Sequence, residues 1–180
     1  MNIFYLNKDP SIAALMHNDK HCVKMILESA QMMCTAHREL DQFYLPNADD
    51  EYIFTQIGIM KDNRDVVYKM AHFNHPCSKW VRYSSSHYEY LYKLFVSLCD
   101  EYTYRYGKVH LTDKKLRVLL KNNPVNIPDA GFKEPPQCMP MVYKHEDTIT
   151  AYRTYYMKAK KSFMHYTKRE TPLWIKEWKE

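Results

Sequence analysis

Glycine is scarce in this sequence: the 180 residues include three, and they lie far apart. The loops that cradle phosphate groups in P-loop and dinucleotide-binding enzymes need closely spaced glycines, so both enzyme classes are excluded. The sequence also lacks an apolar run of the roughly 20 residues that a membrane-spanning helix needs. No secretory signal follows Met1. We therefore expect a cytoplasmic protein with no membrane partner.

Closely spaced cysteine pairs are absent as well. The five cysteines are odd in number and widely separated: Cys22, Cys34, Cys77, Cys99 and Cys138. Thiolate zinc sites usually contain cysteines two to four residues apart, so the sequence predicts free thiols and neither a metal nor another cofactor. His17 and His21 have the spacing of a metal-binding pair. With a third ligand from Glu28 or a distant histidine they form a weaker, metal-binding alternative.

Hydrophobic residues make up 46% of the chain, enough to bury a core. Apolar residues recur at three-four spacing between helix-capping residues, which predicts a single, mainly α-helical domain spanning residues 1–180. Residues 122–143 contain five prolines and cannot form regular structure. We expect this segment to wrap the core or line a site. The predicted helices cover about residues 10–40, 51–71, 84–106, 112–121 and 147–166.

The first long helix is predicted to carry a polar stripe opposite an apolar, core-facing side that includes Val23 and Leu27. This stripe contains His17, His21, Lys24, Glu28, Gln31 and Arg38. Of these, His17, His21, Gln31 and Arg38 are candidates for substrate binding. Lys24 lies one turn before Glu28 and is expected to hold it ionised, and an ionised glutamate can act as a general base. The structural alternative is a solvated helix face stabilised by ion pairs.

A second group of chemically capable side chains follows Asn74, in a segment predicted to be irregular around Pro76. Trp80 could stack on a nucleobase, Arg82 could bind a phosphate, and His75 could transfer a proton. The structural alternative makes Trp80 a core anchor at the start of a helix. These residues are therefore candidates for substrate binding.

The net charge of +5 arises entirely after residue 150, where eight basic residues face three acidic ones. Tyrosines alternate with these cations in the basic aromatic helix and tail of about residues 147–180. Such a pattern suits a nucleic-acid backbone, although a solvated basic helix would look the same. The predicted backbone contacts are Lys158, Lys161, Lys168 and Arg169.

The order of these motifs resembles a family of small bacterial and phage proteins labelled pyrimidine dimer DNA glycosylase-like. More distantly, it is similar to pyrimidine dimer glycosylases of the endonuclease V type. The resemblance covers most of the chain in order. It rests on Asp19-Lys20-His21-x-x-Lys24-x-x-x-Glu28-x-x-Gln31, Asn74-His75-Pro76-x-x-x-Trp80, Cys99-Asp100-Glu101-Tyr102 and Tyr106-Gly107.

This resemblance implies an endonuclease V-like helical bundle that acts on a damaged or modified base in DNA. In that family the N-terminal amine attacks the sugar carbon, and a glutamate on the first long helix assists; the matching residue here is Glu28. Family members expose the amine of a small residue after removal of Met, whereas the bulky Asn2 is expected to retain Met1. The catalytic amine would be that of Met1 or, alternatively, of Lys24.

Two other functions fit the same residues. One is a phage protein that binds or hydrolyses a free nucleotide or a nucleotide-derived signal in the host cytoplasm. The other is a non-enzymatic DNA-binding module that uses the basic final helix. The sequence predicts DNA or a nucleotide as the partner in each case and leaves the oligomeric state open.

Overall fold

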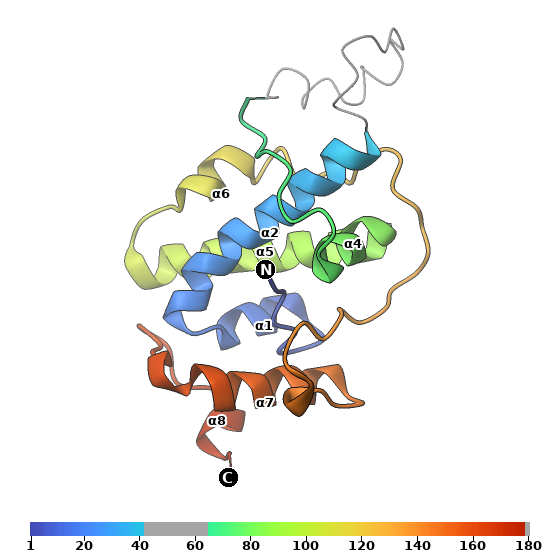
Figure 1. The fold of residues 1–180 in the computed structure, drawn as a ribbon. Coiled ribbons are helices and arrows are strands. Elements are labelled where there is room, and N and C mark those ends of the chain that lie inside the picture. The colour runs from blue at the N-terminus through green and yellow to red at the C-terminus, as the bar shows by residue number, and fades with distance from the viewer. Residues whose placement is uncertain (42–64, 179–180) are drawn as a thin grey trace, which may run out of the picture.

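Helices dominate the computed structural model, which describes residues 1–41 and 65–178 (Figure 1). These ranges contain no β-strand, so the prediction of a mainly α-helical protein is confirmed. The elements are α1 (Pro10–Met16), α2 (Asp19–Leu40), α4 (Pro76–Tyr83), α5 (Ser85–Tyr106), α6 (Leu111–Leu116), η1 (Met141–Tyr143), α7 (Thr148–Lys160), η2 (Lys161–Phe163) and α8 (Leu173–Lys176).

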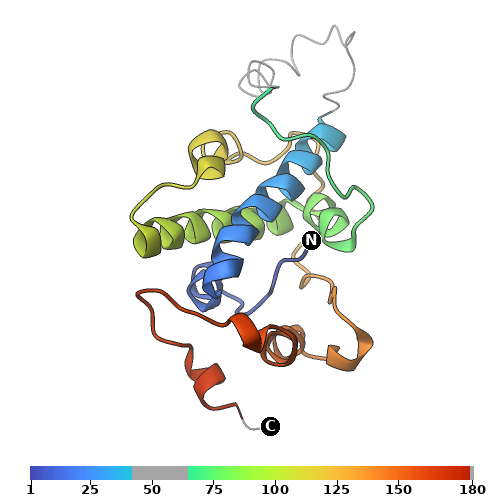
Figure 2. The same ribbon diagram turned by 60° about the vertical axis from the view of Figure 1, so that its left-hand side comes forward.

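Helix α2 lies at the centre of the fold. It packs on α5, α4 and α6, while α1 also packs on α5 (Figures 1 and 2). Met25, Ile26, Leu91 and Phe95 form part of the shared core and are at most 1% exposed. Because neighbours surround α2 on several sides, polar residues along it are buried together with apolar ones.

The predicted continuous helix from Pro10 to Leu40 is wrong, because the chain breaks at His17 and Asn18. His17 has an extended backbone, and the Asn18 side chain accepts a hydrogen bond from the His21 N–H at 2.9 Å. Asn18 therefore caps a new helix. The expected solvent-facing stripe is largely buried, and Val23 and Leu27, expected in the core, are 37% and 39% exposed.

The segment around Pro76, predicted to be irregular, forms α4 instead. Pro76 occupies the first turn, where its missing N–H costs nothing, and the His75 side chain caps the helix. Helix α5 confirms its prediction closely and ends at Gly107, whose φ of 68° favours glycine. Of the helix predicted over residues 51–71, residues 51–64 lie outside the described ranges, and residues 65–71 are not helical.

The proline-rich segment is irregular over residues 122–140, as predicted. It passes α4 and the start of α5 and then reaches α7 (Figure 1). Its carbonyls accept hydrogen bonds from the Trp80 indole at Lys133 and from the Tyr152 hydroxyl at Pro136. Its Cys138 thereby lies beside the N-terminal residues. Among the described helices, none combines the length and apolar character that crossing a membrane requires.

Candidate functional site

Glu28, on the central helix α2, holds two amines and the start of the chain. Its Oε2 accepts a hydrogen bond from the Asn2 N–H at 3.0 Å and lies 3.9 Å from the Met1 amine nitrogen. Its Oε1 lies 3.2 Å from the Lys24 Nζ. The structure therefore brings together the three residues for which the sequence suggested catalytic roles: Met1, Lys24 and Glu28.

The N-terminal segment is fixed in place by buried contacts. The Asn2 side-chain amide donates to the Cys138 carbonyl at 3.0 Å, and the Ser78 hydroxyl donates to the Met1 sulfur at 3.3 Å. Phe4 has a φ of 52°, uncommon for a non-glycine residue, and its ring stacks on His21 at 4.2 Å. The chain start is consequently positioned by side chains from α2, α4 and the proline-rich segment.

Met1 is anchored by its side chain while its main chain reaches the surface. The side chain is 1% exposed, yet the residue as a whole is only partly buried. The exposed part therefore belongs to main-chain atoms, which include the amine. Lys24 is 66% exposed, whereas the Glu28 side chain is 11% exposed. A small ligand approaching this point would meet the exposed Lys24 amine and the main chain of Met1 beside a largely buried carboxylate.

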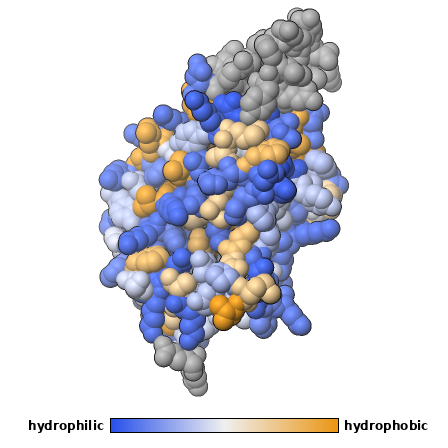
Figure 3. All heavy atoms as spheres, in the orientation of Figure 1, coloured by the Kyte–Doolittle hydropathy of each residue, from blue (hydrophilic) through white to orange (hydrophobic). Residues whose placement is uncertain are grey.

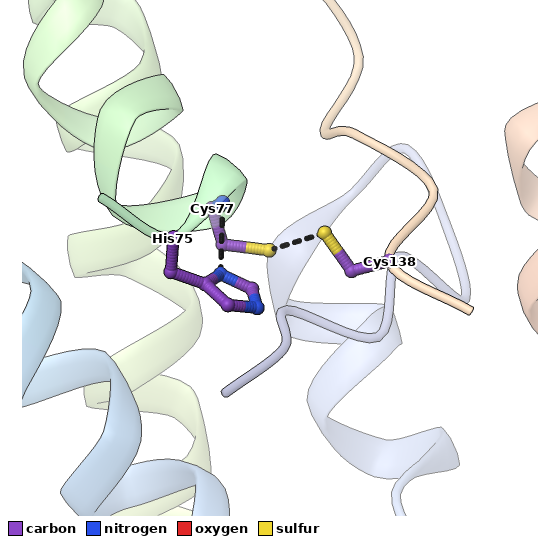
Figure 4. Close-up of side chains that lie close together, drawn as sticks. All are labelled: His75, Cys77 and Cys138. Atoms are coloured by element: carbon purple, nitrogen blue, oxygen red, sulfur yellow. Dashed lines mark hydrogen bonds between the residues drawn. The ribbon is translucent and has the colours of Figure 1, made fainter. Parts of the chain in front are cut away.

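His75, Cys77 and Cys138 form a cluster (Figure 4). The charge of the N-terminal amine acts on all three residues. The sulfurs of Cys77 and Cys138 are 3.5 Å apart, and the His75 Nδ1 accepts the Cys77 N–H at 3.1 Å. The Cys77 thiol donates toward Cys138, which lowers the pKa of Cys138 and raises that of Cys77. Burial, followed by the positive charge of the N-terminal amine, lowers the pKa of His75.

Sequence reasoning missed Asn2, Cys77 and Cys138. The two cysteines are 61 residues apart, so no local spacing could reveal the pair. The available signal was the prediction that the proline-rich segment lines a site, together with the cysteine that follows His75-Pro76. No disulfide links any of the five cysteines in the structure.

The predicted ligand-binding histidines on the first helices are enclosed by packing. His17 is fully buried and its Nδ1 lies 2.7 Å from the Ala13 carbonyl. His21 lies 2.8 Å from the Tyr156 hydroxyl and against Phe4. Burial lowers the pKa of His17 to about 4 and that of His21 to about 3, so both are neutral at pH 7. Gln31 is partly buried on the same helix.

Three other predicted ligand-binding residues make structural contacts: Arg38, Arg82 and Trp80. Arg38 donates to the carbonyls of Val67 and Tyr68, both at 2.7 Å. Arg82 donates to the Phe73 carbonyl at 2.9 Å and lies 4.0 Å above the Phe73 ring.

Trp80 is 8% exposed and stacks on His87 at 4.3 Å, with its indole N–H bonded to Lys133. This burial matches the core-anchor alternative for Trp80. Trp80 still lines an open groove of about 500 Å³, together with Tyr83 and His87.

The predicted backbone-binding cations divide into two groups. Lys158 and Lys161 are exposed on and after α7. Lys168 and Arg169 lie beyond the helix: Lys168 donates to the Tyr104 carbonyl at 3.1 Å, and Arg169 forms a two-pronged ion pair with Glu101. Arg169 is thus already neutralised within the fold.

The chain was compared with protein-family models, curated proteins and solved structures, and none of the three comparisons gave a match.

Proposed function

We propose that this protein is a DNA glycosylase/AP lyase-like enzyme whose nucleophile is the amine of Met1. The observation that carries the proposal is the distance of 3.9 Å between that amine and the Glu28 carboxylate. The same carboxylate also accepts a hydrogen bond from the Asn2 N–H. A primary amine beside an ionised carboxylate is the minimal equipment for forming an imine with a sugar aldehyde. Lys24, 3.2 Å from the other carboxylate oxygen, is the alternative amine.

The proposed chemistry runs through an imine between the protein and the sugar. On an abasic site the neutral amine adds to the C1′ aldehyde, Glu28 takes the proton that the nitrogen loses, and solvent protonates the new alkoxide. Glu28 then returns its proton to the hydroxyl, which leaves as water and gives the protonated imine. The Glu28 carboxylate removes a C2′ proton, the 3′-phosphate leaves by β-elimination, and water hydrolyses the imine to restore the amine. On a damaged base, the same nitrogen displaces the base from C1′, and the base leaves with a proton taken from solvent.

The surroundings of the amine suit a polyanionic substrate. Lys24 is exposed beside Glu28, and Lys144 is exposed near Cys138; both could contact phosphates. The face seen in Figure 3 is mainly hydrophilic, with apolar residues in scattered patches. These features support DNA as the partner. We extend the proposal to an endonuclease V-like helical bundle and, from the five free thiols, to a reducing cytoplasm.

Borohydride trapping on duplexes that contain an abasic site or a thymine dimer tests this function. We expect a covalent protein–DNA adduct with the wild-type protein. The Glu28→Gln variant, which keeps an oxygen for the Asn2 N–H, should trap roughly 10²–10⁴-fold more slowly because general-base assistance is lost. The matched control is Glu39→Gln, an exposed glutamate on the same helix, which should trap at the wild-type rate.

Two results would contradict the proposal. One is the absence of an adduct on both duplexes when intact mass shows a free amine at residue 1. The other is equal trapping by the Glu28→Gln and Glu39→Gln variants, which would remove Glu28 from the chemistry.

A further inference from the structure

His75, Cys77 and Cys138 form the one group of three metal-capable side chains found within the described ranges. Their donor atoms all lie within 4.8 Å of one another. Two of the donors are sulfurs and the third is an imidazole nitrogen. This set of ligands favours zinc over magnesium and calcium, which prefer oxygen ligands. The cluster joins the start of α4 to the proline-rich segment (Figure 4).

The spacing of the sulfurs is close to that of a zinc site. Two bonds of about 2.3 Å at a tetrahedral angle place thiolate sulfurs about 3.8 Å apart. The Sγ atoms of Cys77 and Cys138 are 3.5 Å apart, so a slight separation would admit the ion. A disulfide, by contrast, requires the sulfurs to approach to about 2.05 Å.

The histidine carries its lone pair on a known ring nitrogen. Because the backbone N–H of Cys77 can only donate, the His75 Nδ1 that accepts it at 3.1 Å is unprotonated. A metal at Nδ1 would replace this N–H as the partner of the lone pair, with the proton retained on Nε2.

The degree of burial suits an ion held by three protein ligands. Cys77 is buried, while His75 and Cys138 are partly exposed. A metal can therefore reach the cluster from solvent. Zinc sites with three protein ligands keep their fourth position for water or a substrate.

We propose that His75, Cys77 and Cys138 bind one zinc ion, with water as the fourth ligand. Binding releases two protons to solvent, one from each thiol, and changes no oxidation state. The ion would tie α4 to the proline-rich segment next to Met1 and Asn2, which already contact Ser78 and Cys138. The metal site goes beyond the proposed lyase activity, and its test needs no DNA.

The test titrates the reduced, chelator-treated protein with Co²⁺ and then with Zn²⁺. Alkylation and intact mass first establish that all five thiols are free. We expect one Co²⁺ per chain with thiolate-to-cobalt charge-transfer absorption, displaced by one equivalent of Zn²⁺. The melting temperature should rise with the concentration of free Zn²⁺. Zinc should also slow alkylation of Cys138 at least tenfold, a readout that needs no variant.

Matched variants then assign the ligands. Cys138→Ser and His75→Gln should each weaken Co²⁺ binding at least tenfold, and Cys138→Ser should reduce the charge-transfer band. The controls are Cys34→Ala, a buried cysteine of the core, and His165→Gln, an exposed histidine; both should bind as the wild type does. Melting curves without metal verify that each variant is folded.

The proposal is overturned if the fully reduced wild type binds no Co²⁺ with a thiolate band. It is also overturned if zinc leaves the alkylation rate of Cys138 unchanged, or if folded Cys138→Ser and His75→Gln variants bind as the controls do.

Discussion

Two buried glutamates in this protein each hold two cations, but they hold different kinds of cation. Glu101, on α5, binds Arg105 at 3.2 Å and Arg169 at 2.8 Å. Glu28, on α2, binds the Lys24 amine and the amine of Met1. A guanidinium stays protonated at any ordinary pH and cannot act as a nucleophile, whereas an amine can. The same electrostatic arrangement therefore supports structure at Glu101 and could support chemistry at Glu28.

The groups around Glu101 and Glu28 also differ in how far the bound cations are buried. At Glu101, Arg169 is 36% exposed, whereas Arg105 is buried. Arg105 is 2% exposed and also binds Asp19 at 3.0 Å and the His17 carbonyl at 2.9 Å. These bonds join α5 to the break between α1 and α2. Around Glu28, in contrast, Lys24 is 66% exposed and the main chain of Met1 reaches the surface. Charged residues with every partner inside the fold are expected to stabilise it rather than bind a ligand.

Removing Glu101 should have the largest effect on stability. Glu101→Ala leaves Arg105 and Arg169 without their shared carboxylate, and breaking a buried pair in this way costs roughly 3–5 kcal/mol. The melting temperature should fall by roughly 6–20 °C. The neighbouring Asp100→Ala serves as the control, because Asp100 is 64% exposed in its pair with Arg117 and should cost at most about 1 kcal/mol. Equal losses in the two variants would remove the distinction between the clusters.

Acid should destabilise the N-terminal half through its buried histidines. Burial lowers the pKa of His17 to about 4 and that of His21 to about 3. Below pH 6.5 the unfolded chain binds protons that the folded chain excludes, so stability is complete above pH 6.5 and falls as the pH drops toward 4. Each histidine contributes a loss of about 1.4 kcal/mol per pH unit in this window.

Denaturant unfolding at pH 7.5 and pH 5 measures this acid sensitivity. His21→Gln should flatten the pH profile, whereas the exposed His165→Gln should not. Identical profiles for the two variants would show that His21 is not buried in its neutral form.

The smallest expected effect is on the salt dependence of DNA binding, which should respond to loss of Lys24 but not to loss of Arg169. Lys24→Ala should lower the slope of log affinity against log salt by about 1, because one phosphate contact disappears. Arg169→Ala should leave this slope unchanged, because Glu101 already neutralises the guanidinium. Salt-dependent binding to an abasic duplex, well below both melting temperatures, measures the slopes. A reduced slope for Arg169→Ala with no change for Lys24→Ala would show that Arg169 contacts DNA and Lys24 does not, contrary to this prediction.

The sequence predicted those features that depend on residues close together along the chain. The Lys24–Glu28 pair follows from two residues one helical turn apart, and α5 follows from its apolar stripe and Gly107. The break at Asn18 was missed because its cap is completed by tertiary contact, with Tyr156 bonding the Asn18 N–H at 3.1 Å. Val23 and Leu27 were placed in the core because the prediction assumed a single buried face. Helix α2 instead packs against α4, α5 and α6, and these two residues lie on the side left exposed.

Long-range contacts explain the remaining misses. Cys138 meets Cys77 and Asn2 only because the proline-rich segment crosses α4, which no sequence period encodes. Trp80 and Arg82 have side chains suited to binding a nucleotide. Within the fold, however, Trp80 stacks on His87 and Arg82 packs on the Phe73 ring. Residue type alone could not distinguish these partners from a ligand.

Mapping the borohydride-reduced adduct tests the central claim most directly. After trapping on an abasic duplex and digestion with trypsin, mass spectrometry locates the sugar remnant. The account predicts it on the peptide of residues 1–8, at the Met1 amine beside Glu28. A remnant on Lys24, which would also block cleavage there, would contradict the assignment of Met1 as the nucleophile.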